Sequence, residues 1–180
     1  MRNAVSPLVG VLYRVRNYVP IKFLKQIYFS LIYSKFQYLI SIWGSANLTK
    51  LKPLKKIQNK LIKCIYKLPH LEPTINLYKP KGFLNISSLY KSKVCNLIHS
   101  IKIKEKKGNI HLIPSDITHN YDTRQNSHFK KQIIKSNFGK RSLLYDGIAI
   151  YNDLPNKLKN IQKLNKFKIA VKKYFMAMRD

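Results

Sequence analysis

The sequence contains very few acidic residues. Only 7 of its 180 residues are Asp or Glu, against 35 Lys and Arg, so the formal net charge is +28, and no acid precedes Glu72. A chain this basic repels itself and normally lies against a polyanion. Nucleic acid is the first candidate partner and an anionic membrane surface is the second. A bias toward AT-rich coding sequence explains part of the lysine excess, but it does not explain the scarcity of acids.

Cysteines and long apolar runs are also scarce. Cys64 and Cys95 lack the spacing of metal ligands, which argues against a zinc module and predicts reduced, buried thiols in an intracellular protein. The longest uncharged run, residues 36–49, is shorter than the ~20 apolar residues that a membrane span needs. No secretory signal is visible. We therefore expect a nuclear or cytoplasmic protein that is not secreted, has no transmembrane segment and has no membrane partner.

The residues that catalysis would require are missing as well. A polymerase that uses two Mg²⁺ ions needs neighbouring carboxylates, whereas Asp116, Asp122, Asp146 and Asp153 are isolated in the sequence. No glycine-rich phosphate loop and no nucleophile signature is present. His119 and Asp122 have the spacing of an acid–base pair, but a structural hydrogen bond is the simpler interpretation. We expect no enzymatic activity, no metal and no cofactor from this chain alone.

Hydrophobic residues make up 45 % of the chain and recur mostly at helical spacing, which predicts a mainly α fold. The expected architecture is a helical bundle, then a basic loop, then two C-terminal helices, and residues 129–134 are extended or form a short β-hairpin. The expected helices cover residues 3–17, 20–43, 50–65, 84–101, 143–151 and 161–178. Gly44 is predicted to adopt the positive φ of a helix C-terminus.

Details of the helix ends follow from residue type. Asn47 or Thr49 is expected to cap the third helix, with Pro53 in its first turn, and Asn85 or Ser87 is expected to cap the fourth. The polar break from Lys102 to Gly108 predicts a division into residues 1–103 and 104–180.

The third helix carries the first candidate site. Lysine occupies seven positions in and just after it, with no acid to pair with, so its polar face is expected to contact phosphates. A merely solvated lysine face is the alternative. The seven positions are Lys50, Lys52, Lys55, Lys56, Lys60, Lys63 and Lys67, of which we select Lys50, Lys55, Lys56, Lys60 and Lys63 as nucleic-acid-binding residues.

The second candidate site follows the predicted joint. Residues 119–125, HNYDTRQ, all end in hydrogen-bonding groups, and residues 139–142 form a turn rich in donors. The nucleic-acid-binding residues predicted here are Tyr121, Arg124, Lys130, Lys131, Lys140 and Arg141. Arginine presents a planar fork to phosphate or a base edge, and tyrosine can stack on an unpaired base. The alternatives are core packing for Tyr121 and a buried ion pair with Asp122 for Arg124.

The order of the motifs resembles the region downstream of the polymerase active site in non-LTR (LINE-type, jockey/CR1-like) retrotransposon reverse transcriptases. The matching stretches are residues 12–20 (LYRVRNYVP), 27–46, 54–65 (LKKIQNKLIKCI), 119–125, 139–147 (GKRSLLYDG), 150–160 and 167–175. The resemblance implies a thumb-like region over about residues 7–103, which grips template and primer. The remainder corresponds to a C-terminal segment linked to RNA or target DNA. Tyr151 stands where the family often has tryptophan.

The family's catalytic palm, with paired aspartates in a Tyr-x-Asp-Asp turn that binds Mg²⁺, lies upstream of this region and is absent here. The resemblance therefore implies a fragment of an RNA-directed DNA polymerase that contributes template–primer and nucleic-acid binding. Its expected partners are RNA or DNA and the missing palm and fingers. The alternatives are a stand-alone basic binding module, a non-functional transposon relic, and a membrane-surface or organellar protein.

Overall fold

The structure is a computed structural model that describes residues 2–69, 71–73, 78, 82–103, 112 and 128–178. It is mainly helical and contains no strand among these residues, which confirms the predicted mainly α class. The chain forms two compact units, Met1–Leu89 and Tyr90–Asp180. The division predicted after residue 103 stays a prediction, because the residues that follow it lie outside the described ranges.

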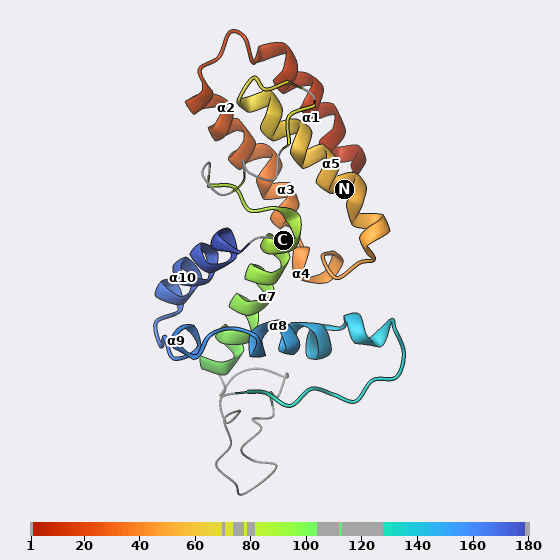
Figure 1. Cartoon of the computed structure of the whole chain (residues 1–180), viewed down its shortest axis with the longest axis vertical. Coiled ribbons are helices and arrows are strands. Elements are labelled where there is room, and N and C mark those ends of the chain that lie inside the picture. Colours follow the sequence, from red (N-terminus) through yellow and green to blue (C-terminus); the bar gives the residue numbers. More distant parts are fainter. Residues whose placement is uncertain are drawn as a thin grey trace, which may run out of the picture. The chain divides into compact units, whose positions relative to one another are not determined.

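The helices of the two units are coloured along the chain in Figure 1. In the first unit they are α1 (Arg2–Val15), α2 (Ile21–Ile27), the π-helical η1 (Tyr28–Tyr33), α3 (Ser34–Gln37), α4 (Ile40–Trp43) and α5 (Leu48–Ile65). Helix α7 (Ile86–Ile103) begins in the first unit and continues in the second. The second unit adds η3 (Gly139–Arg141), η4 (Leu143–Gly147), α8 (Ile148–Asn152), α9 (Asn156–Lys159) and α10 (Leu164–Ala177).

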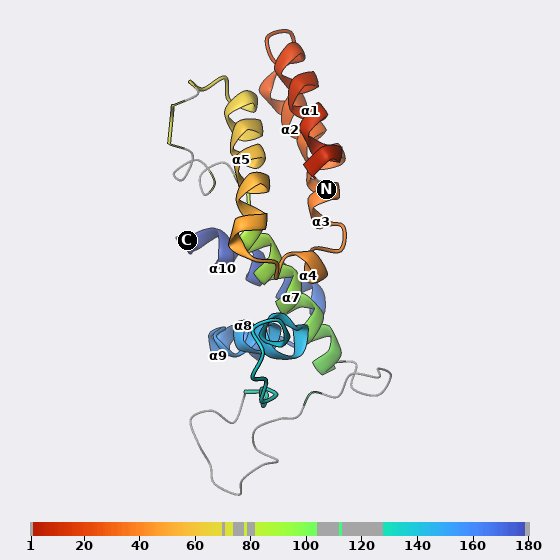
Figure 2. The same cartoon turned by 90° about the vertical axis from the view of Figure 1, so that its right-hand side faces the viewer.

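The core of the first unit forms where α1 and α2 pack against α5 (Figures 1 and 2). The side chains that fill it are almost completely inaccessible to solvent. They are Val5, Leu12, Leu24, Tyr28, Ile32, Phe36, Leu61, Ile62 and Ile65. Each large apolar side chain contributes about 1.5–3 kcal/mol when it is buried in this way. Gln58, also buried, donates from Nε2 to the Tyr28 hydroxyl (3.1 Å) and to the Leu84 carbonyl (2.8 Å).

The long second helix predicted from the sequence is broken. It passes from α2 through η1 to α3 and then stops, because Tyr38 is extended and Leu39 has φ +49°. Gly44 has φ −69°, so the prediction that it takes the positive φ was wrong. A left-handed residue costs roughly 1–2 kcal/mol. The Trp43 indole N–H, which donates to the Tyr38 carbonyl at 2.7 Å, helps to hold the break.

The ends of α5 and α7 follow from backbone hydrogen bonding. Pro53 lies in the second turn of α5 rather than the first, because the helix begins at Leu48. Lys67, with φ +55°, closes the helix in a Schellman arrangement in which the Leu68 N–H donates to the Lys63 carbonyl at 2.9 Å. Asn85 caps α7 as predicted, since its Oδ1 accepts from the Ser88 N–H at 2.8 Å.

The second unit is built around a buried histidine. The ring of His99 on α7 stacks on Phe167 of α10, with 3.5 Å between ring centroids. Its Nδ1 lies 2.9 Å from the Tyr151 hydroxyl and its Nε2 lies 2.8 Å from the Ile161 carbonyl oxygen. A carbonyl can only accept, so Nε2 carries the proton, and Nδ1 of the neutral ring accepts from Tyr151. The histidine thus ties α7, α8 and the start of α10 together.

Residues 129–134 contain no strand, and among the described residues of this segment only Phe129 forms an isolated β-bridge. The side-chain amide of Asn152 also pairs with this backbone, because its Oδ1 accepts from the Phe129 N–H (3.0 Å) and its Nδ2 donates to the Phe129 carbonyl (2.8 Å). The backbone of Phe129 is therefore satisfied by α8. Cys64 and Cys95 are buried and free, as predicted.

Candidate nucleic-acid interface

Four lysines form a continuous stripe along α5. Lys52, Lys56, Lys60 and Lys63 follow one another at intervals of four, four and three residues, so they share one face of the helix. The opposite face is buried and includes Leu54, Leu61 and Ile65. We call the four residues the lysine stripe. Because α5 itself contains no acidic residue, the charge of the stripe is not compensated along its own helix.

The stripe contains part of the predicted set. Lys56, Lys60 and Lys63 belong to it, whereas Lys50 and Lys55 lie on either side of it, roughly 100° or more from its centre around the helix. Lys52, which was left out of the predicted set, completes it. Its four-residue spacing from Lys56 inside the expected helix 50–65 was the signal that could have included it.

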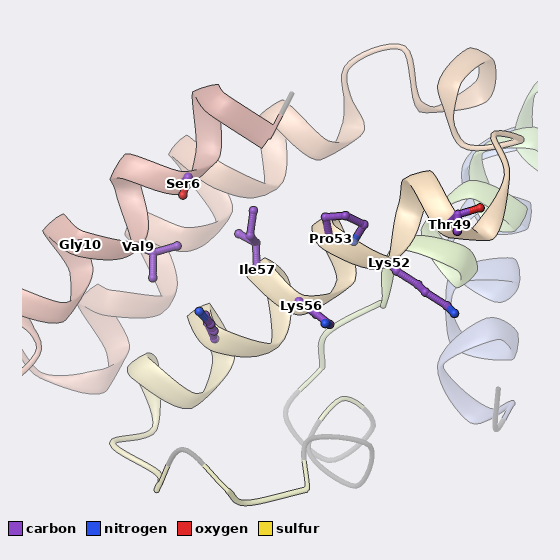
Figure 3. Close-up of a pocket in the computed structure, with 9 residues that line it drawn as sticks. Ser6, Val9, Gly10, Thr49, Lys52, Pro53, Lys56 and Ile57 are labelled. Atoms are coloured by element: carbon purple, nitrogen blue, oxygen red, sulfur yellow. The ribbon is translucent and has the colours of Figure 1, made fainter.

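An open groove of about 520 Å³ lies between α1 and α5 beside this stripe (Figure 3). Val9 and Ile57 project from the two helices into the space between them, and Lys52 and Lys56 lie at the α5 rim. The residues that line the groove are Ser6, Val9, Gly10, Thr49, Lys52, Pro53, Lys56, Ile57 and Lys60. The groove therefore has an apolar floor, two hydroxyl groups and three lysines, but no acid.

The electrostatics of this surface favour an anion. Residues 1–89 contain 15 Lys and Arg and a single acid, Glu72. Lysines four residues apart on a helix repel one another and destabilise it by roughly 0.2–0.5 kcal/mol per pair. Lys52, Lys56 and Lys60 make two such pairs. A bound polyanion would remove this repulsion, so its binding would stabilise α5.

The second predicted site is only partly described. Lys130 and Lys131 are exposed beside Phe129, and Lys140 and Arg141 are exposed on the short helix η3. Between the two pairs, residues 132–135 have no regular secondary structure and residues 136–138 turn into η3 (Figure 1). Tyr121, Arg124 and the rest of residues 119–125 lie outside the described residues, so their roles stay predictions.

A buried lysine in the second unit was not anticipated. Lys159 occurs in the sequence NKLKN, which is typical of an exposed helix, yet only 2 % of its surface is accessible. Its Nζ donates to the Asn152 carbonyl at 2.6 Å, and burial lowers its pKa despite the opposing effect of Asp153. Lys159, His99 and Lys102 line a smaller cavity of about 400 Å³. The hydrogen bond shows that Lys159 has a structural role.

Other classes of site are not seen in the described part of the chain. No group of three or more His, Cys, Asp or Glu residues there has an arrangement suited to a metal ion. None of the helices in the same ranges has both the length and the apolar character that crossing a membrane requires. No family model, curated protein or solved structure matches this chain.

Proposed function

We propose that this chain binds nucleic acid through the phosphate backbone, with the lysine stripe as its main contact surface. The observation that carries the proposal is the stripe itself: four lysines on one face of α5, opposite the buried face, on a helix without an acid. Lysines act on phosphates as point charges and give affinity with little sequence preference.

The sequence resemblance supplies a context for this binding. We propose that the chain belongs to an RNA-directed DNA polymerase of the non-LTR retrotransposon kind and helps to hold template and primer. Catalysis would then require a palm with paired aspartates and Mg²⁺, which this sequence does not contain. RNA or DNA and that palm would be its partners. A stand-alone basic binding module is the second candidate, and it is favoured by the compact unit that residues 1–89 form.

A membrane surface fits the stripe less well. A helix that lies on a membrane presents an apolar face to the lipid alongside its basic face. The apolar face of α5, with Leu54 and Leu61, is buried inside the first unit and is therefore not available to lipid. Of α5, only the charged face remains exposed.

The test is a titration of labelled single-stranded RNA and DNA with the purified chain, followed by fluorescence anisotropy between about 50 and 200 mM salt. If four lysines contact a single strand, log affinity should fall with log salt with a slope of about −3, since each contact contributes about −0.7. Replacing Lys52, Lys56 and Lys60 together by glutamine should flatten the slope by about 2.

The matched control replaces three exposed lysines of α10, Lys166, Lys172 and Lys173, by glutamine and so removes the same charge. The α5 variant should lose much more affinity than this control. Equal losses would show that binding depends on net charge alone and would remove the lysine stripe as a site. Affinity that does not change with salt would overturn the proposal.

A further inference from the structure

We infer that the groove between α1 and α5 receives an unpaired base of a single strand whose phosphates lie along the lysine stripe. The inference rests on the proposed function and concerns the unpaired part of the bound nucleic acid, so it predicts a preference for a single strand over a duplex. It is carried by the shape and lining of the groove. Lysines that only contact phosphates would not need a groove beside them.

The lining is suited to a flat, mostly apolar ring with polar edges. Val9, Pro53 and Ile57 provide an apolar floor, and Figure 3 shows Val9 and Ile57 directed into the gap from opposite sides. Ser6 and Thr49 add one hydroxyl from each helix, and a hydroxyl can donate or accept. The edges of a base carry both hydrogen-bond donors and hydrogen-bond acceptors. A duplex offers this groove nothing to fill it, because its bases are already paired and stacked.

The groove also has room for such a ring. Gly10 lies on α1 one turn after Ser6, and a Cβ added to Gly10 would meet no other atom within 4 Å. The two small residues therefore leave the α1 side of the groove unfilled. The volume of about 520 Å³ lies within the range of about 300–1,000 Å³ that is typical of small-ligand pockets.

The charges occupy the position that a bound nucleotide would need. Lys52, Lys56 and Lys60 line the same groove as the apolar floor. Successive members are about 6 Å apart along the helix axis, since four residues rise by that distance. An extended single strand could therefore place a base in the groove while its phosphates on either side meet consecutive lysines. The base would then lie between α1 and α5 while α5 holds the backbone.

The experiment compares three ligands of equal length at one salt concentration: a single strand, the same strand with abasic sites throughout, and a duplex. Phosphate contact alone would favour the duplex, because its charge density is higher. We expect the intact single strand to bind about fivefold more tightly than the abasic strand, and more tightly than the duplex. A contact worth about 1 kcal/mol produces a difference of that size.

A variant locates the effect in the groove. Gly10→Leu places a side chain in the open space, so it should reduce the affinity for the intact strand to that for the abasic strand and leave the salt slope unchanged. The control is Val11→Leu, which alters the neighbouring exposed position of α1, outside the groove. Circular dichroism checks that both variants fold, and the comparison of the three ligands with the unmodified chain does not depend on either.

The outcomes separate the two proposals. Equal, salt-dependent binding of the intact and abasic strands would overturn the base-binding groove and leave the lysine stripe in place. Tighter binding of the duplex would overturn the groove as well. The absence of binding to all three ligands, or binding that does not respond to salt, would overturn the proposed function and the groove together.

Discussion

The two compact units carry the same formal charge but place their polar groups differently. Residues 1–89 contain 15 basic and one acidic residue and residues 90–180 contain 20 and six, so each has a formal charge of +14 (15 − 1 and 20 − 6). In the first unit, Lys52, Lys56 and Lys60 are exposed beside an open groove. In the second, Lys159 and His99 are buried and hydrogen bonded. Because exposed lysines occur in both units, neither the number of charges nor their exposure alone locates a binding surface, and it is the groove beside the lysine stripe that distinguishes it.

Two glycines show the same contrast in packing. A Cβ at Gly10 in α1 would meet empty space. A Cβ at Gly147 would lie 2.9 Å from a methyl group of Val94, 3.0 Å from Leu143 and 3.2 Å from Ile98. The space beside the backbone is thus open at Gly10 and filled by side chains at Gly147. This comparison yields four predictions about stability.

The largest effect is expected from His99→Ala in the second unit. The substitution removes the ring that stacks on Phe167 and leaves the buried Tyr151 hydroxyl and the Ile161 carbonyl without a partner. Loss of a buried ring together with unpaired polar groups should cost about 3 kcal/mol of unfolding free energy. Urea titration followed by far-ultraviolet circular dichroism measures it.

The control for this variant is Tyr151→Phe, which removes one hydroxyl and keeps both rings. It should cost only about 1 kcal/mol. If His99→Ala and Tyr151→Phe had the same small effect, the histidine would not be the centre of the second unit, and the contrast between the units would be weaker than the structure indicates.

The next largest effect is expected from Gly147→Ala. The new methyl group would collide with Val94 and Leu143, and overpacking of this kind costs about 1–3 kcal/mol. The better helix propensity of alanine returns up to about 1 kcal/mol. The net expectation is a loss of about 1 kcal/mol in the same urea titration. A gain in stability would show that the packing around Gly147 is looser than that of a filled core.

The predictions that came from local sequence were largely accurate, and those that needed a distant partner were not. Hydrophobic periodicity located α1, α5, α7 and α10, and a capping residue located the start of α7. The break at Leu39 was missed because glycine is the residue expected at positive φ. There the indole N–H of Trp43, which donates to the Tyr38 carbonyl, helps to hold the conformation instead.

The candidate site shows the same difference between features marked by local sequence and features that depend on a distant partner. The basic face of α5 was evident from the run of lysines, but the selection included Lys50 and Lys55 and left out Lys52, whose spacing places it on the same face as Lys56. The groove could not be predicted at all, since it depends on how α1 packs against α5. Burial of Lys159 was equally hidden, because its partner is a carbonyl of α8 that no sequence pattern marks.

Acidic pH should destabilise the chain through His99. Burial lowers the pKa of His99 below 6.5, with a smaller contribution from Lys102, and the hydrogen bond to Ile161 opposes the change. The unfolded chain therefore binds the proton first as pH falls. The stabilisation is complete above about pH 6.5 and is lost as pH falls through that value toward the lower pKa of the folded state.

The measurement is unfolding free energy at pH 7.5 and 5, compared between the unmodified chain and His99→Gln. The unmodified chain should lose more stability on acidification, by an amount smaller than the whole cost of removing the ring. His128, whose pKa burial also lowers, is present in both chains, so its contribution cancels. Identical pH dependence in the two chains would show that His99 titrates normally and is not buried in solution.

The smallest expected effect is a gain in stability, and it tests whether the space beside Gly10 is open. Gly10→Ala puts a methyl group into empty space within α1, where alanine is favoured over glycine by about 0.8–1 kcal/mol, so stability should rise by up to that amount. Gly82→Ala is the matched control, because a Cβ at Gly82 would also meet empty space but the residue has φ +75°. There the substitution should instead cost about 1 kcal/mol. Urea titration of both variants decides whether room around the Cβ or backbone conformation governs each site. If Gly10→Ala destabilised the chain as much as Gly82→Ala does, α1 and α5 would be closed against each other in solution, and the groove that we assign to an unpaired base would not exist.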